Sequence, residues 1–102
     1  MIDSLFAMAK LIGSNSKKIH DLGVVKLGLF GSYVRNEQTP ESDLDFLVEF
    51  DPIKKNFDNY FALAELLEGI FEKHVDLLTI ESLSPYIGPH ILKEVQYFEI
   101  PA

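Results

Sequence analysis

Hydrophobic positions along the chain follow two periods, and the segments that carry them predict alternating helices and strands. Apolar residues recur at helical spacing in residues 4–12, and a second short helical segment covers residues 14–22. Residues 24–30 have apolar side chains at both odd- and even-numbered positions, which is typical of an interior strand covered on much of both faces. We therefore expect two N-terminal helices followed by an interior strand.

Residues 43–50 have the alternating pattern of a second strand with two different faces. The even positions are all apolar, whereas Asp43, Asp45 and Glu49 share the odd face. A turn-rich segment, residues 36–42, connects this strand to the first one. One face of the strand is therefore expected to pack in the core and the other to stay open.

The rest of the chain predicts a helix, a third strand and a final helix. Asp58 can cap a helix whose apolar residues recur at three- and four-residue steps as far as Phe71. Residues 74–80 are predicted to form a strand, and Gly88-Pro89 introduces the last helix. The apolar residues of that last helix are Ile91, Leu92, Val95 and Phe98. This order predicts one α/β (α+β) domain over residues 1–102, with a small mixed β-sheet whose helices cover one face.

Composition excludes several classes of function. The chain has 102 residues and contains no cysteine, so disulfides, thiolate metal sites and a cysteine nucleophile are excluded. A net charge of −7 repels phosphodiester backbones, so direct nucleic-acid binding is not expected. The sequence shows neither a basic leader nor an apolar segment that could span a bilayer, so we expect a cytoplasmic protein without membrane contact. The histidines His20, His74 and His90 show no ligand spacing and are interpreted as structural or exposed.

Two aspartates on one strand face are the first candidates for chemistry. Asp43 and Asp45 are two residues apart, so their carboxylates point the same way, about 6.6 Å apart along the chain. Magnesium typically binds one or two carboxylates together with substrate phosphates. Asp76 interrupts an apolar strand and is the candidate third ligand, so that two ions would stabilise the oxygens of a phosphoryl or nucleotidyl transfer. The competing interpretation is a solvated strand face.

A possible phosphate-binding segment follows the first strand. Gly31 lets the backbone approach a phosphate closely, and Ser32 offers a hydroxyl and an N–H at the start of a helical turn. Arg35 is the sole arginine of the chain and lies one helical turn after Ser32. Its guanidinium either engages phosphate oxygens or forms a surface ion pair with Glu37 or Glu41.

These residues carry a resemblance to a known family. Gly31-Ser32, ten intervening residues and Asp43-Leu44-Asp45 resemble the motif of DNA polymerase β-like nucleotidyltransferases, most of all the minimal nucleotidyltransferases. The strand with Asp76 also falls where that family places its third aspartate. The resemblance is strong over residues 24–80 and extends to residues 86–94. It implies the polymerase β-like nucleotidyltransferase fold.

The resemblance also implies roles for these residues. Asp43 and Asp45 would hold magnesium at the triphosphate of ATP, and Asp76 would bind a second ion and help to activate the acceptor hydroxyl. Gly31 and Ser32 would bind phosphate. Attack on the α-phosphorus would release pyrophosphate.

A partner is implied by the same resemblance. Minimal family members commonly act with a separately encoded, all-helical HEPN-type toxin, as its antitoxin, so the expected reaction transfers AMP from ATP to a tyrosine of that toxin. Two alternatives stay open. One is a non-catalytic module that binds nucleotide or neutralises the toxin, and the other is a small-molecule nucleotidyltransferase that needs a partner subunit. Homo- and hetero-oligomers are both compatible with the sequence.

Overall fold

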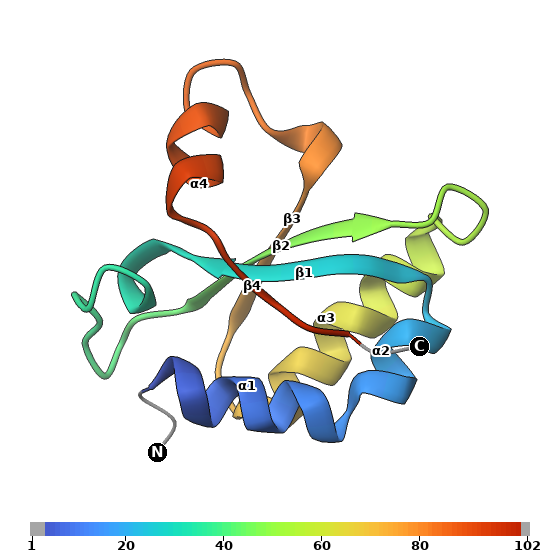
Figure 1. The fold of residues 1–102 in the computed structure, drawn as a ribbon, viewed down its shortest axis with the longest axis horizontal. Helices are drawn as coiled ribbons and strands as arrows, with labels where there is room; N and C mark the ends of the chain where they lie inside the picture. The colour runs from blue at the N-terminus through green and yellow to red at the C-terminus, as the bar shows by residue number, and fades with distance from the viewer. Residues whose placement is uncertain (1–3, 101–102) are drawn as a thin grey trace.

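The two strands expected before residue 51 form the centre of a four-stranded sheet with the order β3-β2-β1-β4. The computed structural model describes residues 4–100 (Figure 1). Its elements are α1 (Leu5–Ser14), α2 (Ser16–Asp21), β1 (Val24–Phe30), the 3₁₀ turn η1 (Gly31–Tyr33), β2 (Leu44–Phe50), α3 (Phe57–Phe71), β3 (Val75–Thr79), the 3₁₀ turn η2 (Ile80–Ser82), α4 (Gly88–Glu94) and β4 (Gln96–Phe98). β1 pairs antiparallel with β2 and β4, and β2 pairs parallel with β3, so the sheet is mixed as expected.

One face of the sheet packs against α1, α2 and α3 and holds the main core (Figure 1). The even positions of β2 all belong to this core, which confirms the face assignment made from their alternation. Phe46 lies at its centre, fully buried, with its ring centroid 5.8 Å from that of Phe71 and 6.3 Å from that of Phe98. Burying a large apolar side chain of this kind stabilises a fold by roughly 1.5–3 kcal/mol.

The opposite face carries the remaining helix. Phe30, Leu47 and Ile91 form a second, smaller buried cluster. Leu47 is an apolar residue among the odd-numbered positions of β2, and α4 packs over this face of the sheet (Figure 1). The mixed sheet with helices is therefore confirmed, but the expectation that the helices cover one face holds only for α1, α2 and α3, because α4 packs on part of the opposite face. The uncovered part of this face lies beside Asp43, Asp45 and Asp76.

The prediction for the last helix is wrong in its second half. α4 ends at Glu94, and residues 96–98 form β4 instead of continuing the helix to Phe98. β1 would otherwise have an unpaired edge, and at Gly28 it has no side chain, which lets the final strand approach closely: a Cβ at Gly28 would collide with the side chains of Val95 and Tyr97. Hydrogen bonding to the edge of β1 therefore determines the structure of residues 96–98, although the spacing of their apolar residues suits a helix.

The predicted cap of α3 is also wrong. The helix begins at Phe57, and Asn56 caps it by accepting a hydrogen bond of 2.8 Å from the N–H of Asn59. Asp58 lies inside the first turn, where its negative charge still interacts favourably with the helix dipole. Within residues 4–100, no helix is long and apolar enough to cross a membrane.

Candidate active site

The three predicted aspartates lie together at one end of the sheet. In the register of the strands, Phe30 of β1 lies beside Asp45 of β2, and Asp45 lies beside Asp76 of β3. Asp43 directly precedes β2. Asp43 and Asp76 are exposed, whereas Asp45 between them is half-buried. Segments distant in the sequence thus bring three carboxylates to one open surface.

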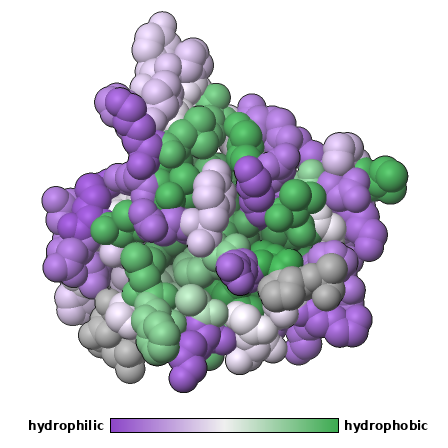
Figure 2. All heavy atoms as spheres, viewed as in Figure 1, coloured by the Kyte–Doolittle hydropathy of each residue, from purple (hydrophilic) through white to green (hydrophobic). Residues whose placement is uncertain are grey.

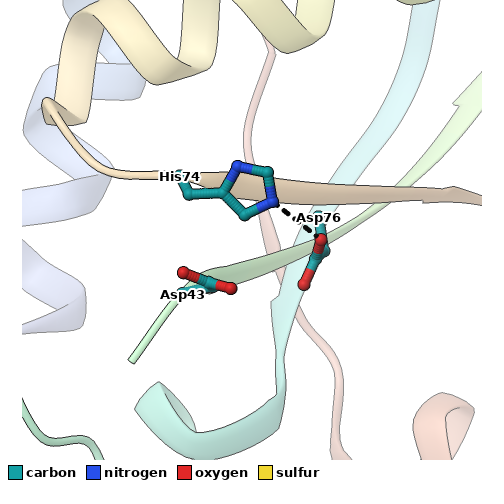
Figure 3. Close-up of side chains that lie close together, drawn as sticks. All are labelled: Asp43, His74 and Asp76. Atoms are coloured by element: carbon teal, nitrogen blue, oxygen red, sulfur yellow. Dashed lines mark hydrogen bonds and ion pairs between the residues drawn. The ribbon is translucent and has the colours of Figure 1, made fainter. Parts of the chain in front are cut away.

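A histidine completes this acidic group. One ligand atom from each of Asp43, His74 and Asp76 lies within 4.8 Å of the other two (Figure 3). His74 Nε2 lies 3.2 Å from Asp76 Oδ1, and its Nδ1 lies 3.2 Å from Glu68 Oε2. Desolvation lowers the pKa of His74, but the negative charges of Asp43, Asp76 and Glu68 outweigh it and raise the pKa overall.

His74 is exposed, as expected, but the sequence analysis did not place it in the site. Its distance of two residues from Asp76 is the available signal, because residues i and i+2 of an extended segment share a face. Glu68, from α3, has no comparable signal, since its contact with His74 depends on how α3 packs beside β3.

The surroundings of Asp45 disfavour the charged form of its carboxylate. Its pKa is raised to about 6, mainly by burial and further by the negative charges of Asp76 and Asp43 and a hydrogen bond with Asp76. Arg35 lowers the pKa but is the smallest of these effects. The attraction of Arg35 thus only partly offsets the effect of burial and of the two neighbouring carboxylates on Asp45.

This donor set fits a divalent cation. Carboxylate oxygens are the protein ligands that Mg²⁺ prefers, and two of them together with substrate phosphates typically complete its coordination. A cation between Asp43, Asp45 and Asp76 would relieve their mutual repulsion, which is the usual reason for grouping carboxylates at a phosphoryl-transfer site.

Gly31 lets the backbone after β1 lie close to the side chain of Asp45. Its φ of +82° lies in the left-handed region, and a Cβ at this position would collide with Oδ2 of Asp45. Glycine is therefore required here both by conformation and by space. Ser32 follows within η1, a single turn of 3₁₀ helix, and is half-buried.

Glu94 of α4 closes the other side of this loop. The N–H of Gly31 donates a hydrogen bond of 2.7 Å to Glu94 Oε2, and Arg35 Nη1 lies 3.0 Å from Glu94 Oε1. Arg35 Nε also forms an ion pair of 2.9 Å with Glu37. The ion pair with Glu37 is the second of the two expectations for Arg35, and the ion pair with Glu94 was not expected; binding of phosphate by Arg35 stays a prediction. Glu94 was missed because no spacing rule links it to Gly31.

Asp45 should make the stability of the metal-free protein depend on pH. Its pKa is about 6 in the folded chain, against an ordinary value of 3.8, so the folded state keeps a proton that the unfolded state has lost between these values. Stability should therefore fall as pH rises from about 4 to 6, by on the order of 1 kcal/mol once solvent screening is allowed for. Urea unfolding across this range, with and without Mg²⁺, measures the effect. A fall of equal size with saturating Mg²⁺ would contradict the metal assignment.

The fold and the site together define a nucleotidyltransferase: a mixed sheet with a glycine loop after one central strand and paired aspartates on the next. A family model described as nucleotidyltransferase domain matches residues 9–98, and the chain belongs to that family.

Individual relatives agree with this assignment. The protein adenylyltransferase MntA of Thermococcus cleftensis is 35% identical over 95 residues, which cover 92% of this chain and 95% of that protein. A solved structure assigned as a minimal nucleotidyltransferase has a TM-score of 0.70 at 26% identity and covers 86% of this chain and 93% of its own. A crystal structure of a toxin–antitoxin with AMP-PNP has a TM-score of 0.62 at 25% identity and covers 81% of this chain and 71% of that one.

Proposed function

We propose that this chain is a Mg²⁺-dependent protein adenylyltransferase that transfers AMP from ATP to a tyrosine hydroxyl of an all-helical HEPN-type toxin, and so acts as a cytoplasmic antitoxin. The observation that carries the proposal is the register of β2 and β3, which sets Asp45 beside Asp76 with Asp43 at the adjoining strand end. The similarity to an adenylyltransferase over nearly the whole chain supports the choice of AMP.

Each site residue has a role in this proposal. Asp43 and Asp45 would hold Mg²⁺ together with the triphosphate, and Asp76 would bind a second ion. Bound Mg²⁺ neutralises charge that develops on the attacking and leaving oxygens. Gly31 and Ser32 let the phosphates approach the backbone closely, and Arg35 exchanges its ion pairs with Glu37 and Glu94 for phosphate oxygens.

The reaction is an in-line displacement at phosphorus. The tyrosine oxygen forms a bond to the α-phosphorus, the bond from that phosphorus to the β-phosphate oxygen breaks, and pyrophosphate leaves. The protein contributes mainly by positioning the reactants and balancing charge. Half-burial of Asp45 strengthens its interaction with a cation relative to a fully exposed carboxylate.

The partner is argued from charge and from a structural neighbour. A chain with net charge −7 suits a basic partner such as an RNA-binding toxin, because opposite fields accelerate association. Each AMP added to a tyrosine of that partner would bring a negative phosphodiester to its surface and oppose RNA binding. The similar toxin–antitoxin structure with AMP-PNP supports both a protein partner and an adenine nucleotide for this chain.

The proposal is tested by incubating the purified chain with Mg²⁺ and ATP, with and without the helical protein encoded beside it, followed by intact-mass spectrometry. We expect the partner to gain one or more AMP units, and EDTA to prevent the gain. A tight complex without any gain in mass would favour a binding-only antitoxin. A labelled low-mass product formed without protein partner would favour a small-molecule nucleotidyltransferase.

A further inference from the structure

The proposed function leaves the imidazole of His74 without a role, although it lies against two of the three aspartates. In the part of the chain that the structure describes, residues 4–100, one ligand atom from each of Asp43, His74 and Asp76 lies within 4.8 Å of the other two. Figure 3 shows the imidazole beside Asp76, with Asp43 on the neighbouring segment that enters β2. Asp45, which is half-buried, is not a member of this set.

The backbone of His74 is held against β2. The N–H of Leu44, the first residue of β2, donates a hydrogen bond of 3.0 Å to the carbonyl oxygen of His74. This contact brings Asp43, the residue before Leu44, next to His74. Because His74 and Asp76 are two residues apart on an extended segment, their side chains share a face. The pairing of β2 with β3 therefore places all three side chains.

Glu68 of α3 sets the orientation of the imidazole. Its Oε2 accepts a hydrogen bond of 3.0 Å from the N–H of Val75 and lies 3.2 Å from Nδ1 of His74. A carboxylate in this position accepts the proton of Nδ1, so Nε2 is the nitrogen that carries the lone pair in the neutral imidazole. Histidines that bind metals commonly have such a carboxylate on the ring nitrogen that does not bind the metal.

The other ring nitrogen faces a carboxylate at the spacing of two metal ligands. Nε2 of His74 lies 3.2 Å from Oδ1 of Asp76. Two ligands that lie about 2.1 Å from a cation, at right angles to each other, are about 3 Å apart. A divalent cation between Nε2 and Oδ1 therefore satisfies the lone pairs of both atoms.

These side chains are accessible to a cation and to its remaining ligands. The side chain of His74 is 62% exposed, and that of Asp76 is 54% exposed. Figure 2 shows hydrophilic side chains gathered at the left of the view, over the loop that joins β1 to β2 and ends at Asp43. A cation bound here keeps open positions for water or phosphate oxygens, as catalytic metal sites do.

We propose that His74 is a ligand, through Nε2, of the divalent cation that Asp76 binds, with Asp43 as a further ligand. This inference rests on the metal dependence of the proposed function and deepens it by assigning a nitrogen ligand. Imidazole suits first-row transition metals, whereas Mg²⁺ prefers ligands that are all oxygen. The nitrogen therefore makes this position select Mn²⁺ over Mg²⁺.

Pulsed EPR of bound Mn²⁺ tests the assignment without catalysis. Mn²⁺ is added in less than equimolar amount to the purified full chain, and the electron spin echo is analysed for coupling to a directly bound nitrogen nucleus. We expect this coupling in the parent chain, and we expect its pattern to change when the histidines are labelled with ¹⁵N. His74→Asn should abolish it, because asparagine keeps an amide near Glu68 but has no atom at the position of Nε2. Absence of nitrogen coupling in the parent chain would overturn the proposal.

The affinities for the two metals give a second measure. When each metal alone is titrated calorimetrically, His74→Asn should raise the Kd of Mn²⁺ about tenfold and change the Kd of Mg²⁺ less. His20→Asn is the matched control, because His20 is exposed on α2 and lies near Asp21. It should change neither the coupling nor the two affinities. Loss of the coupling in His20→Asn would place the bound Mn²⁺ at that pair and contradict the proposal.

His74→Gln separates a metal ligand from a hydrogen-bond donor. The amide of glutamine can donate to Asp76, so it should restore the behaviour of the parent chain if His74 only orients that carboxylate. If His74 is a ligand, the amide does not replace it, and both the nitrogen coupling and the preference for Mn²⁺ stay lost. Recovery of the parent Kd for Mn²⁺ in His74→Gln would therefore count against the ligand.

The outcomes for this proposal and for the proposed function can be told apart. Nitrogen coupling that His74→Asn abolishes, in a chain that transfers no AMP, supports the ligand and rejects the activity. Transfer of AMP by a parent chain that shows no nitrogen coupling supports the activity and rejects the ligand.

Discussion

Asp45→Asn is expected to abolish AMP transfer and at the same time to stabilise the fold. Asparagine keeps the size of the side chain but cannot supply the negative charge that a cation at this position requires, so the rate should fall by at least about 10³-fold. At pH 7 the substitution also removes a half-buried carboxylate whose pKa is raised to about 6 by burial and by Asp76 and Asp43. A gain on the order of 1 kcal/mol in unfolding free energy should result, after allowance for solvent screening.

Initial rates of partner modification and urea unfolding of the same preparation measure the two effects together. Glu49→Gln is the matched control, because Glu49 lies on the same strand and the same face as Asp45 but away from the carboxylate group. It should leave the rate within about twofold of the parent value. Loss of activity accompanied by loss of stability in Asp45→Asn would mean that Asp45 has a structural role instead.

The double variant Asp43→Asn/Asp45→Asn separates the enzyme from a binding-only antitoxin. The chain is expected to bind the partner through surfaces outside the carboxylates, so the variant should still form a complex while failing to protect cells from the partner. Full protection by the double variant would show that neutralisation does not require transfer.

The three aspartates of this site could be predicted from the sequence because their positions depend on the pattern of residues within single strands. The alternation around Asp45 predicts a strand with one core face and one open face, and residues two apart on a strand must share a face. The position of Asp76 within an apolar strand follows from the same rule. Parallel pairing of the two strands then needs only the helical crossover between them, which the regular spacing of apolar residues as far as Phe71 predicts.

The parts that were missed depend on contacts between distant segments. Nothing near Glu94 indicates that its carboxylate binds the N–H of Gly31, 63 residues earlier in the chain. Likewise, residues 96–98 have apolar spacing that suits a helix, and they become a strand because β1 offers an edge and Gly28 gives room to reach it. Local propensity is weak enough for such pairing to override it.

Gly31→Ala should reduce both stability and activity, in contrast to Asp45→Asn. An alanine at a φ of +82° costs roughly 1–2 kcal/mol in backbone strain, and its Cβ would also push Oδ2 of Asp45 from its place. Displacing a reacting group by about 1 Å typically costs about 10²-fold in rate, so transfer should fall by at least that factor. Gly69→Ala is the matched control: a Cβ there meets nothing within 4 Å and favours the helix, so stability should rise slightly.

A double-mutant cycle divides the effect of Gly31→Ala into strain and collision. In an Asp45→Ala background the carboxylate is gone, and the Cβ of residue 31 would lie 3.2 Å from that of residue 45, a contact that a small backbone shift relieves. The destabilisation caused by Gly31→Ala should therefore shrink to the strain alone, and the two substitutions should be strongly non-additive. Additive losses of unfolding free energy would contradict a direct collision between residue 31 and Asp45. In that case the glycine would serve the conformation of the loop, and the position of the carboxylate would not depend on it.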